Sequence, residues 1–175
     1  EEMLSRVKRE AKAMGDAPYL LALLGLNTGL RISDLLQVRV GDIRDKGYIA
    51  RREIKTGKQT EIRFHPAVVA EIRRLTSTRQ GHELLFASRQ LARRDRSITR
   101  DTAYKWIVKM CRRAGMTEPV GCHTLRKTYG YHYYMRYHDI VSLMMHFNHS
   151  SERVTLRYIG VTQEMINEKT QKFRL

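Results

Sequence analysis

Apolar residues recur at helical spacing along most of the chain. A basic amphipathic segment over residues 3–14 predicts a first helix that ends at Gly15. Residues 19–26 are apolar on nearly every side, so we expect the helix that contains them to lie in the core. A short helix is expected to begin near Arg31.

The pattern changes between Val38 and Phe64. The residues there are β-prone and are separated by turn signals at Asp45-Lys46-Gly47 and at Lys55-Thr56-Gly57-Lys58. This pattern predicts a small antiparallel sheet of three strands, inserted near the N-terminal third of the chain.

The remainder of the chain returns to helical periodicity. Residues 76–100 are mostly polar, except for a short apolar stretch at residues 84–86 that we expect to be buried. Helices are expected at about residues 66–75, 103–114, 123–136, 139–147, 151–158 and 163–173. Residues 1–175 therefore read as one domain in the α+β class, mainly α.

The formal charge of +15 is the strongest signal in the composition. The basic residues are dispersed among the apolar positions, which indicates a folded basic face and favours a nucleic acid as partner over a membrane surface. No apolar run approaches the length needed to cross a bilayer. Cys111 and Cys122 show no CxxC spacing, so we expect a reducing, cytoplasmic compartment.

Several residues have types and spacings that suit chemistry on phosphates. Arg31 opens a helix, where backbone N–H groups also favour an anion. Lys55 lies at an expected hairpin tip, and His123 and Arg126 are three residues apart on one helical face. Each of these residues alone is better explained as solvated or structural.

Tyr158 and two histidines require the same caution. Tyr158 is one of nine tyrosines in the chain. In helical domains most tyrosines are half-buried core residues. His146 and His149 could be read as metal ligands, but no further Cys or carboxylate ligand has a suitable spacing. The acidic residues also lack the paired clusters of a two-metal nuclease. We therefore expect no metal site and no cofactor.

The motifs taken together change this interpretation. In chain order they are Asn27-Thr28-Gly29-Leu30-Arg31-Ile32-Ser33-Asp34, Lys55-Thr56-Gly57-Lys58, His123-Thr124-Leu125-Arg126, His149-Ser150-Ser151 and Thr155-Leu156-Arg157-Tyr158. This order resembles the tyrosine recombinase (phage integrase) family over about residues 16–160. The His-x-x-Arg box and the nine-residue step from His149 to Tyr158 are the most specific parts. The chain departs from the family at Asn148, where Gly is usual before the histidine.

The resemblance implies that Tyr158 attacks a DNA phosphodiester, which leaves a 3′-phosphotyrosyl link and a free 5′-hydroxyl without metal or ATP. A phenol is mostly protonated at neutral pH, so it needs proton removal as it attacks, and His123 is the candidate helper. Lys55 is the candidate general acid for the leaving 5′-oxygen.

The remaining implied roles concern the phosphate charge. Arg31 and Arg126 would neutralise the non-bridging oxygens, and His149 would add a hydrogen bond. Asp34 would organise the arginine side of the site. The predicted enzyme is a site-specific recombinase or integrase of a mobile genetic element.

Double-stranded DNA is the expected partner, with affinity that comes mainly from phosphate contacts and falls steeply with salt. Relatives assemble four protomers in a synapse, and accessory DNA-bending or directionality proteins are further expected partners. The candidate DNA contacts are Arg51, Arg52, Lys58, Arg93, Arg94, Arg96, Arg112, Arg113 and Lys127.

Relatives usually carry an N-terminal helical domain that completes a clamp around DNA, and this sequence contains no such segment. Residues 162–175 form a weakly apolar tail with Met165, Ile166 and Phe173 on a polar background. By resemblance, we expect this tail to pack on a neighbouring protomer.

Two alternatives remain open at this point. A tyrosine-type topoisomerase would relax supercoiled DNA through the same covalent step without exchanging strands. A basic helical DNA-binding module would have no catalytic activity, and Tyr158 would then be only a core aromatic.

Overall fold

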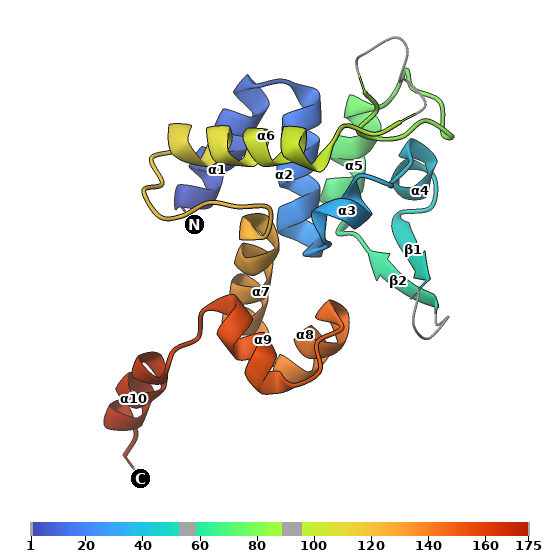
Figure 1. Cartoon of the computed structure of the whole chain (residues 1–175). Coiled ribbons are helices and arrows are strands. Elements are labelled where there is room, and N and C mark those ends of the chain that lie inside the picture. The colour runs from blue at the N-terminus through green and yellow to red at the C-terminus, as the bar shows by residue number, and fades with distance from the viewer. Residues whose placement is uncertain (1, 53–58, 89–95, 175) are drawn as a thin grey trace.

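The computed structural model describes residues 2–52, 59–88 and 96–174 (Figure 1). Its elements are α1 (Glu2–Ala13), α2 (Asp16–Thr28), α3 (Ile32–Leu35), α4 (Val40–Arg44), β1 (Tyr48–Arg52), β2 (Gln59–Arg63), α5 (Pro66–Leu75), α6 (Arg100–Arg113), α7 (Thr124–Tyr137), α8 (Ile140–Phe147), α9 (Glu152–Ile159) and α10 (Gln163–Lys172). The expected α+β class, mainly α, is confirmed.

Helix α2 forms the centre of the larger core. It contacts α1, α3, α5, α6 and α7, and Leu20, Leu21 and Leu24 on it are almost fully buried. A helix surrounded in this way must be apolar on every side, as the sequence of residues 19–26 predicts. The N-terminal helices and α6 thus form a compact body, from which α7 extends (Figure 1).

The described residues contain a sheet of two strands, so the prediction of three is wrong. Strands β1 and β2 pair antiparallel, with Tyr48 opposite Arg63. The β-prone residues expected to form the other strand lie in α4, where the Asp42 carboxylate accepts a hydrogen bond from the Arg39 amide at 3.0 Å. Val40 and Ile43 are both buried, because a spacing of three residues places them on one face of this short helix.

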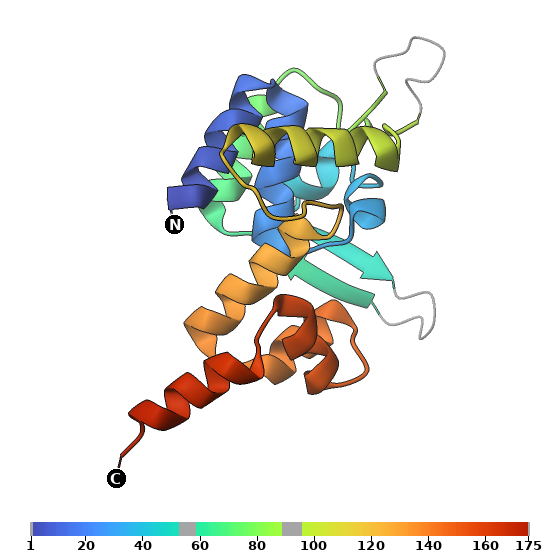
Figure 2. The ribbon, with the colours of Figure 1, turned by 60° about the vertical axis from the view of Figure 1, so that its left-hand side comes forward.

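A smaller core lies at the far end of α7. Leu143 and Phe147 of α8 and Ile159 of α9 are buried there, and the tyrosines of α7 pack around them. Gly130 allows the close approach, since a Cβ on it would lie 2.7 Å from the Ile159 side chain and 2.8 Å from the Phe147 ring. Figure 2 shows α8 and α9 side by side against the outer half of α7.

Helix α10 follows the smaller core and projects away from the other helices in both views (Figures 1 and 2). The Thr162 hydroxyl begins the helix by accepting a hydrogen bond from the Met165 amide. Phe173, just beyond its end, is 71% exposed. Across the described ranges, no helix is both long and apolar enough to cross a membrane.

Candidate active site

The turn between α2 and α3 positions Arg31. Helix α2 ends at Gly29, whose left-handed backbone (φ 60°) closes the helix through a hydrogen bond to Gly25 O. Leu30 is buried and anchors the turn, so the next side chain, Arg31, lies half-buried at the start of α3. Its guanidinium reaches to 3.5 Å from the carbonyl oxygen of Phe147.

Arg126 occupies the centre of the site and is only 3% exposed. Its guanidinium donates to Gly29 O at 2.6 Å and to Phe147 O at 2.9 Å, and it stacks on the Phe147 ring at 4.0 Å. Arg126 therefore ties the end of α2 to the end of α8. Because Arg31 approaches the same Phe147 carbonyl, the two guanidinium groups converge on one region.

The segment after α8 orients His149. Its Nδ1 lies 3.1 Å from Oγ1 of Thr155, a buried residue of α9. The Thr155 hydroxyl donates its only hydrogen to Ser151 O, so it accepts from Nδ1–H of His149. This arrangement leaves Nε2 as the unprotonated nitrogen of the neutral His149 ring. Burial lowers the pKa of His149, and the charges of Arg126 and Arg31 lower it further.

Tyr158 projects from α9 into this group of side chains. Its ring lies edge-on to the rings of His149 and Phe147, with centroids 5.1 and 5.7 Å away, and Lys127 Nζ lies 5.6 Å from its centroid. Burial raises the pKa of the Tyr158 phenol, while the charges of Arg126 and Arg31 act in the opposite direction. The phenol is therefore protonated at neutral pH.

His123 provides a group that can accept the phenol proton. It immediately precedes α7, and its Nδ1 lies 3.1 Å from Oη of Tyr158. In the tautomer protonated at Nε2, the phenol donates to Nδ1. Burial lowers the pKa of His123, and nearby Arg100 adds to this effect. The imidazole therefore stays neutral at neutral pH, as a proton acceptor must be.

The structure brings Arg31, His123, Arg126, His149 and Tyr158 together from separate parts of the chain. Their individual roles stay predictions.

Lys55 lies outside the described residues. Asp34 lies half-buried one turn into α3, where its amide donates to the Arg31 carbonyl at 2.9 Å.

The candidate DNA contacts are distributed unevenly. Arg51 and Arg52 belong to β1, while Lys58, Arg93 and Arg94 lie outside the described residues. Lys127 is exposed beside Tyr158, and Arg96 is exposed shortly before the start of α6.

Arg112 and Arg113 lie at the other end of α6, roughly 20 Å from its first residue at 1.5 Å per residue. Arg112 also donates to the Met116 carbonyl at 2.7 Å, a contact that closes the helix end.

Motif reading missed several residues that shape the site. Phe147 contributes both a carbonyl for the arginines and a ring against Tyr158. Thr155 fixes the orientation of His149, a role that its position one turn before Tyr158 could have suggested. Arg100 acts on His123 across the fold, for which the sequence offers no local signal.

His146, three residues before His149, packs within the fold. Its Nε2 lies 2.6 Å from Thr28 O, and its ring packs on Tyr129. Within the part of the chain that the structure describes, no three His, Cys, Asp or Glu side chains gather as a metal site would require.

Comparison with known proteins agrees with the fold and the motifs. Residues 1–165 match the phage integrase family. The chain is 36% identical over 163 residues to YoeC of Bacillus subtilis (strain 168), a probable integrase/recombinase, covering 93% of this chain and 88% of YoeC. The chain belongs to the phage integrase family, the tyrosine recombinases, which cleave and rejoin DNA strands.

Two solved structures share the fold. The XerA recombinase matches with a TM-score of 0.75 at 20% identity, covering 100% of this chain and 62% of that one. A lambda integrase tetramer bound to a Holliday junction matches with a TM-score of 0.66 at 20% identity, covering 89% of this chain and 46% of that one. The chain thus spans less than two thirds of either protein.

Proposed function

We propose that this chain is the catalytic domain of a site-specific DNA recombinase in which Tyr158 is the nucleophile. The observation that carries the proposal is the 3.1 Å contact between Oη of Tyr158 and Nδ1 of His123, beside the guanidinium groups of Arg126 and Arg31. A nucleophile within reach of a neutral base, next to permanent cations, is the arrangement that attack on a phosphodiester requires.

The cleavage step can be written with these groups. Oη of Tyr158 forms a bond to phosphorus as its proton passes to Nδ1 of His123. The bond from phosphorus to the 5′-oxygen breaks, and Lys55 supplies the proton for the departing hydroxyl. The 3′-phosphotyrosyl ester retains the bond energy, so attack by another 5′-hydroxyl reverses the step without ATP. Free Tyr158 is then restored.

The cations of the site stabilise the developing charge. Arg126 is held by two backbone carbonyls, so its guanidinium is fixed in place beside Tyr158, where its permanent charge stabilises the developing negative charge. His149 donates its Nδ1–H to Thr155, and therefore it donates Nε2–H to the phosphate only after taking up a proton. The negative charge of the bound phosphate favours this uptake.

The proposed substrate is double-stranded DNA, bound as an assembly of several copies. The charge of +15, the family and the lambda integrase tetramer on a Holliday junction support this proposal. We further propose that α10 packs on a neighbouring copy, since it projects from the helices of its own chain (Figure 2).

Covalent capture tests the nucleophile. Nicked suicide duplexes of randomised sequence trap the cleaved state, because the short segment between the cleaved bond and the nick, which carries the released 5′-hydroxyl, diffuses away. We expect a denaturant-resistant adduct with the parent chain and with Tyr134→Phe, a control at another half-buried tyrosine, but none with Tyr158→Phe. An adduct that persists in Tyr158→Phe, or its absence from the parent on every duplex, would refute the assignment.

The topoisomerase alternative shares the covalent step, and it is separated by the product. A recombinase is expected to leave a supercoiled plasmid unrelaxed when the plasmid carries none of the sequences recovered as covalent adducts. Relaxation of such a plasmid at the rate seen with a plasmid that carries one of them would favour the topoisomerase.

A further inference from the structure

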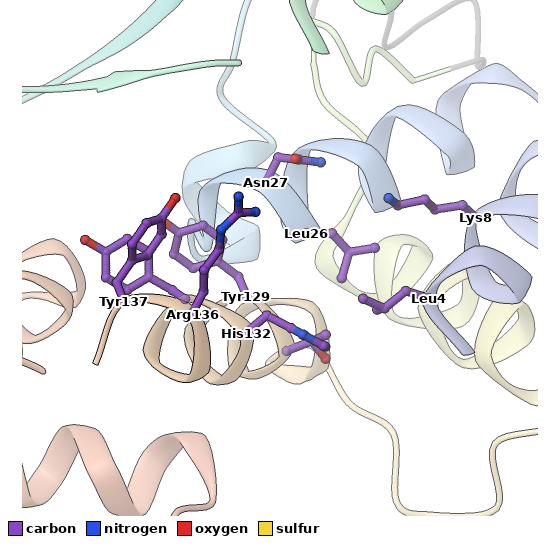
Figure 3. Close-up of a pocket in the computed structure, with 10 residues that line it drawn as sticks. Leu4, Lys8, Leu26, Asn27, Tyr129, His132, Arg136 and Tyr137 are labelled. Carbon is purple, nitrogen blue, oxygen red and sulfur yellow. The ribbon is translucent and has the colours of Figure 1, made fainter. Parts of the chain in front are cut away.

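A groove runs along the side of α7 that faces α1, away from Tyr158. Its wider part has a volume of about 400 Å³ and is bounded by α1, the end of α2 and α7 (Figure 3). A narrower part of about 170 Å³ adjoins it and shares Leu4, Leu26, Thr128 and His132. Together the two parts follow α7 from Thr124 to Tyr137, a distance of roughly 20 Å at 1.5 Å per residue.

The two ends of the groove differ in chemistry. The narrow end is apolar, with Val7, Met116 and Leu125 in its wall. The wide end carries the rings of Tyr129, Tyr133 and Tyr137, together with two cations. Figure 3 shows these cations, Lys8 and Arg136, on either side of Asn27.

Neither cation has an acidic partner among the residues that the structure describes. In the described part of the chain, no carboxylate lies within ion-pair distance of Lys8 or Arg136. Cations beside phenol rings attract acidic groups, and the rings offer flat apolar surface. A small ligand would not span about 20 Å, whereas an apolar side chain followed by acidic residues along a peptide would.

We propose that this groove is a docking site for an acidic segment of a partner protein, with one apolar side chain inserted between α1 and α7. The tail of a second copy fits less well, because residues 163–175 carry three basic and two acidic side chains. Docking in this groove does not require the strand-cleavage chemistry assigned to Tyr158.

Tyr129 connects the groove to the active site. Its ring lines the wide end of the groove and also packs on Phe147. It lies against Gly29 as well, since a Cβ on Gly29 would come within 2.4 Å of that ring. Gly29 and Phe147 are the two residues whose carbonyls hold Arg126. An occupant that shifts Tyr129 therefore changes how Arg126 is held.

Peptide binding tests the docking directly. The probes are two fluorescein-labelled peptide pools of about twelve residues, long enough for the groove, each with one leucine and either glutamates or lysines at the other positions. We expect the full chain to bind the glutamate pool and not the lysine pool. The double variant Lys8→Glu, Arg136→Glu should lower the affinity about tenfold or more.

A matched variant controls for net charge. Arg9→Glu with Lys109→Glu reverses two exposed cations that line neither part of the groove, and it should keep the affinity within about twofold. Equal losses in the two double variants, equal binding of the two pools, or displacement of the acidic probe by a peptide of residues 163–175 at lower concentration would overturn the proposal.

The coupling to the site has its own measurement. The acidic pool should change the rate of covalent adduct formation by the parent chain, and it should not change that rate for the Lys8→Glu, Arg136→Glu variant. Binding of the probe with an unchanged rate would refute the coupling and leave the docking intact. A parent chain that forms no adduct would instead count against the proposed function.

Discussion

At the scale of single residues, the site depends on opposite effects of burial on two neighbouring groups. Burial raises the pKa of the Tyr158 phenol and lowers the pKa of His123. Both shifts favour the uncharged pair, in which the phenol donates to Nδ1 of His123 across 3.1 Å. The proton therefore has a defined acceptor before DNA binds, and the cations supply stabilisation only as the phosphate becomes more charged.

The lowered pKa of His123 predicts the acid limit of cleavage. As pH rises through that pKa, the imidazole loses its proton and can accept one from Tyr158, so the rate should rise. At higher pH the rate should fall again, because His149 then loses the proton that it needs to donate Nε2–H to the phosphate. The midpoint of the rise should lie below 6.5, the ordinary value for histidine. Single-turnover cleavage at sub-saturating DNA, followed against pH, measures this midpoint for the free enzyme.

Two histidine variants assign that limit. His123→Asn should be slow and should lose the acid limb, whereas His149→Asn should be slow and should keep it. A limb that vanishes only in the His149 variant would assign the titrating base to His149.

The backbone conformation at Asn148 explains why the chain can depart from the family pattern there. It ends α8 with a left-handed backbone (φ 51°, ψ 50°), a conformation that glycine adopts freely and asparagine tolerates better than other residues. We expect Asn148→Gly to change the free energy of unfolding by no more than about 0.5 kcal/mol. Asn148→Val should cost about 1–2 kcal/mol or more, because a β-branched side chain clashes in this conformation. Urea unfolding measures both, and equal stability of the two variants would contradict this reading.

At the scale of elements, the distance between α7 and α9 sets the geometry of the nucleophile. His123 precedes α7 and Tyr158 projects from α9, so the contact between their side chains depends on how closely the helices pack. Gly130 sits at that crossing, directly against Ile159 and Phe147.

Gly130→Ala should separate these helices. The added Cβ would lie 2.7–2.9 Å from the side chains of Ile159 and Phe147, and such overpacking costs about 1–3 kcal/mol. Cleavage should fall further than this loss of stability explains, because Ile159 is adjacent to Tyr158. Gly121→Ala is the control, since its Cβ would meet nothing within 4 Å. Wild-type cleavage by a destabilised Gly130→Ala chain would contradict the proposed dependence.

The helices were predictable from the sequence because their apolar spacing is local. The segment from Val38 to Ile43 was not, because Val40 and Ile43 bury equally well on a strand or on one helical turn. The Asp42 carboxylate, bonded to the Arg39 amide, favours the helix. The pattern of apolar residues alone does not distinguish a strand from a helical turn here.

The candidate site shows the same division. Spacing within the chain selected Tyr158 and His149, and the structure places their rings 5.1 Å apart. The anchoring of Arg126 by Gly29 and Phe147 depends on contacts between α7 and two distant segments. Backbone carbonyls have no sequence signature, so only the fold identifies these two acceptors.

At the scale of the whole molecule, part of the basic excess is structural. Arg44 donates to the carbonyl of Arg79, and Arg79 donates to the carbonyls of Leu84 and Leu85. These contacts stabilise the irregular segment that follows α5. These side chains contribute to the charge of +15 without being free to contact a phosphate. DNA affinity should therefore depend on fewer cations than the composition suggests, and its dependence on salt should be correspondingly shallower.

The tail provides a prediction about assembly. Helix α10 projects from the other helices, and Met165 is only partly buried while Phe173 is largely exposed. Deleting residues 162–175 should therefore leave the thermal midpoint of the isolated chain nearly unchanged, since little of its core is removed. Binding to DNA with a single target half-site should also persist. Complexes with two or more copies on one DNA should become weaker, because the contact proposed for α10 is made to a neighbour.

Phe173→Asp separates loss of that apolar contact from loss of the segment. It should weaken the same complexes while keeping the helix, and Thr170→Asp, an exposed position with the same change in charge, should weaken them less. Sedimentation of chain and DNA at several protein concentrations measures the assembly. Unchanged assembly after deletion of residues 162–175 would show that neighbouring copies associate through other surfaces.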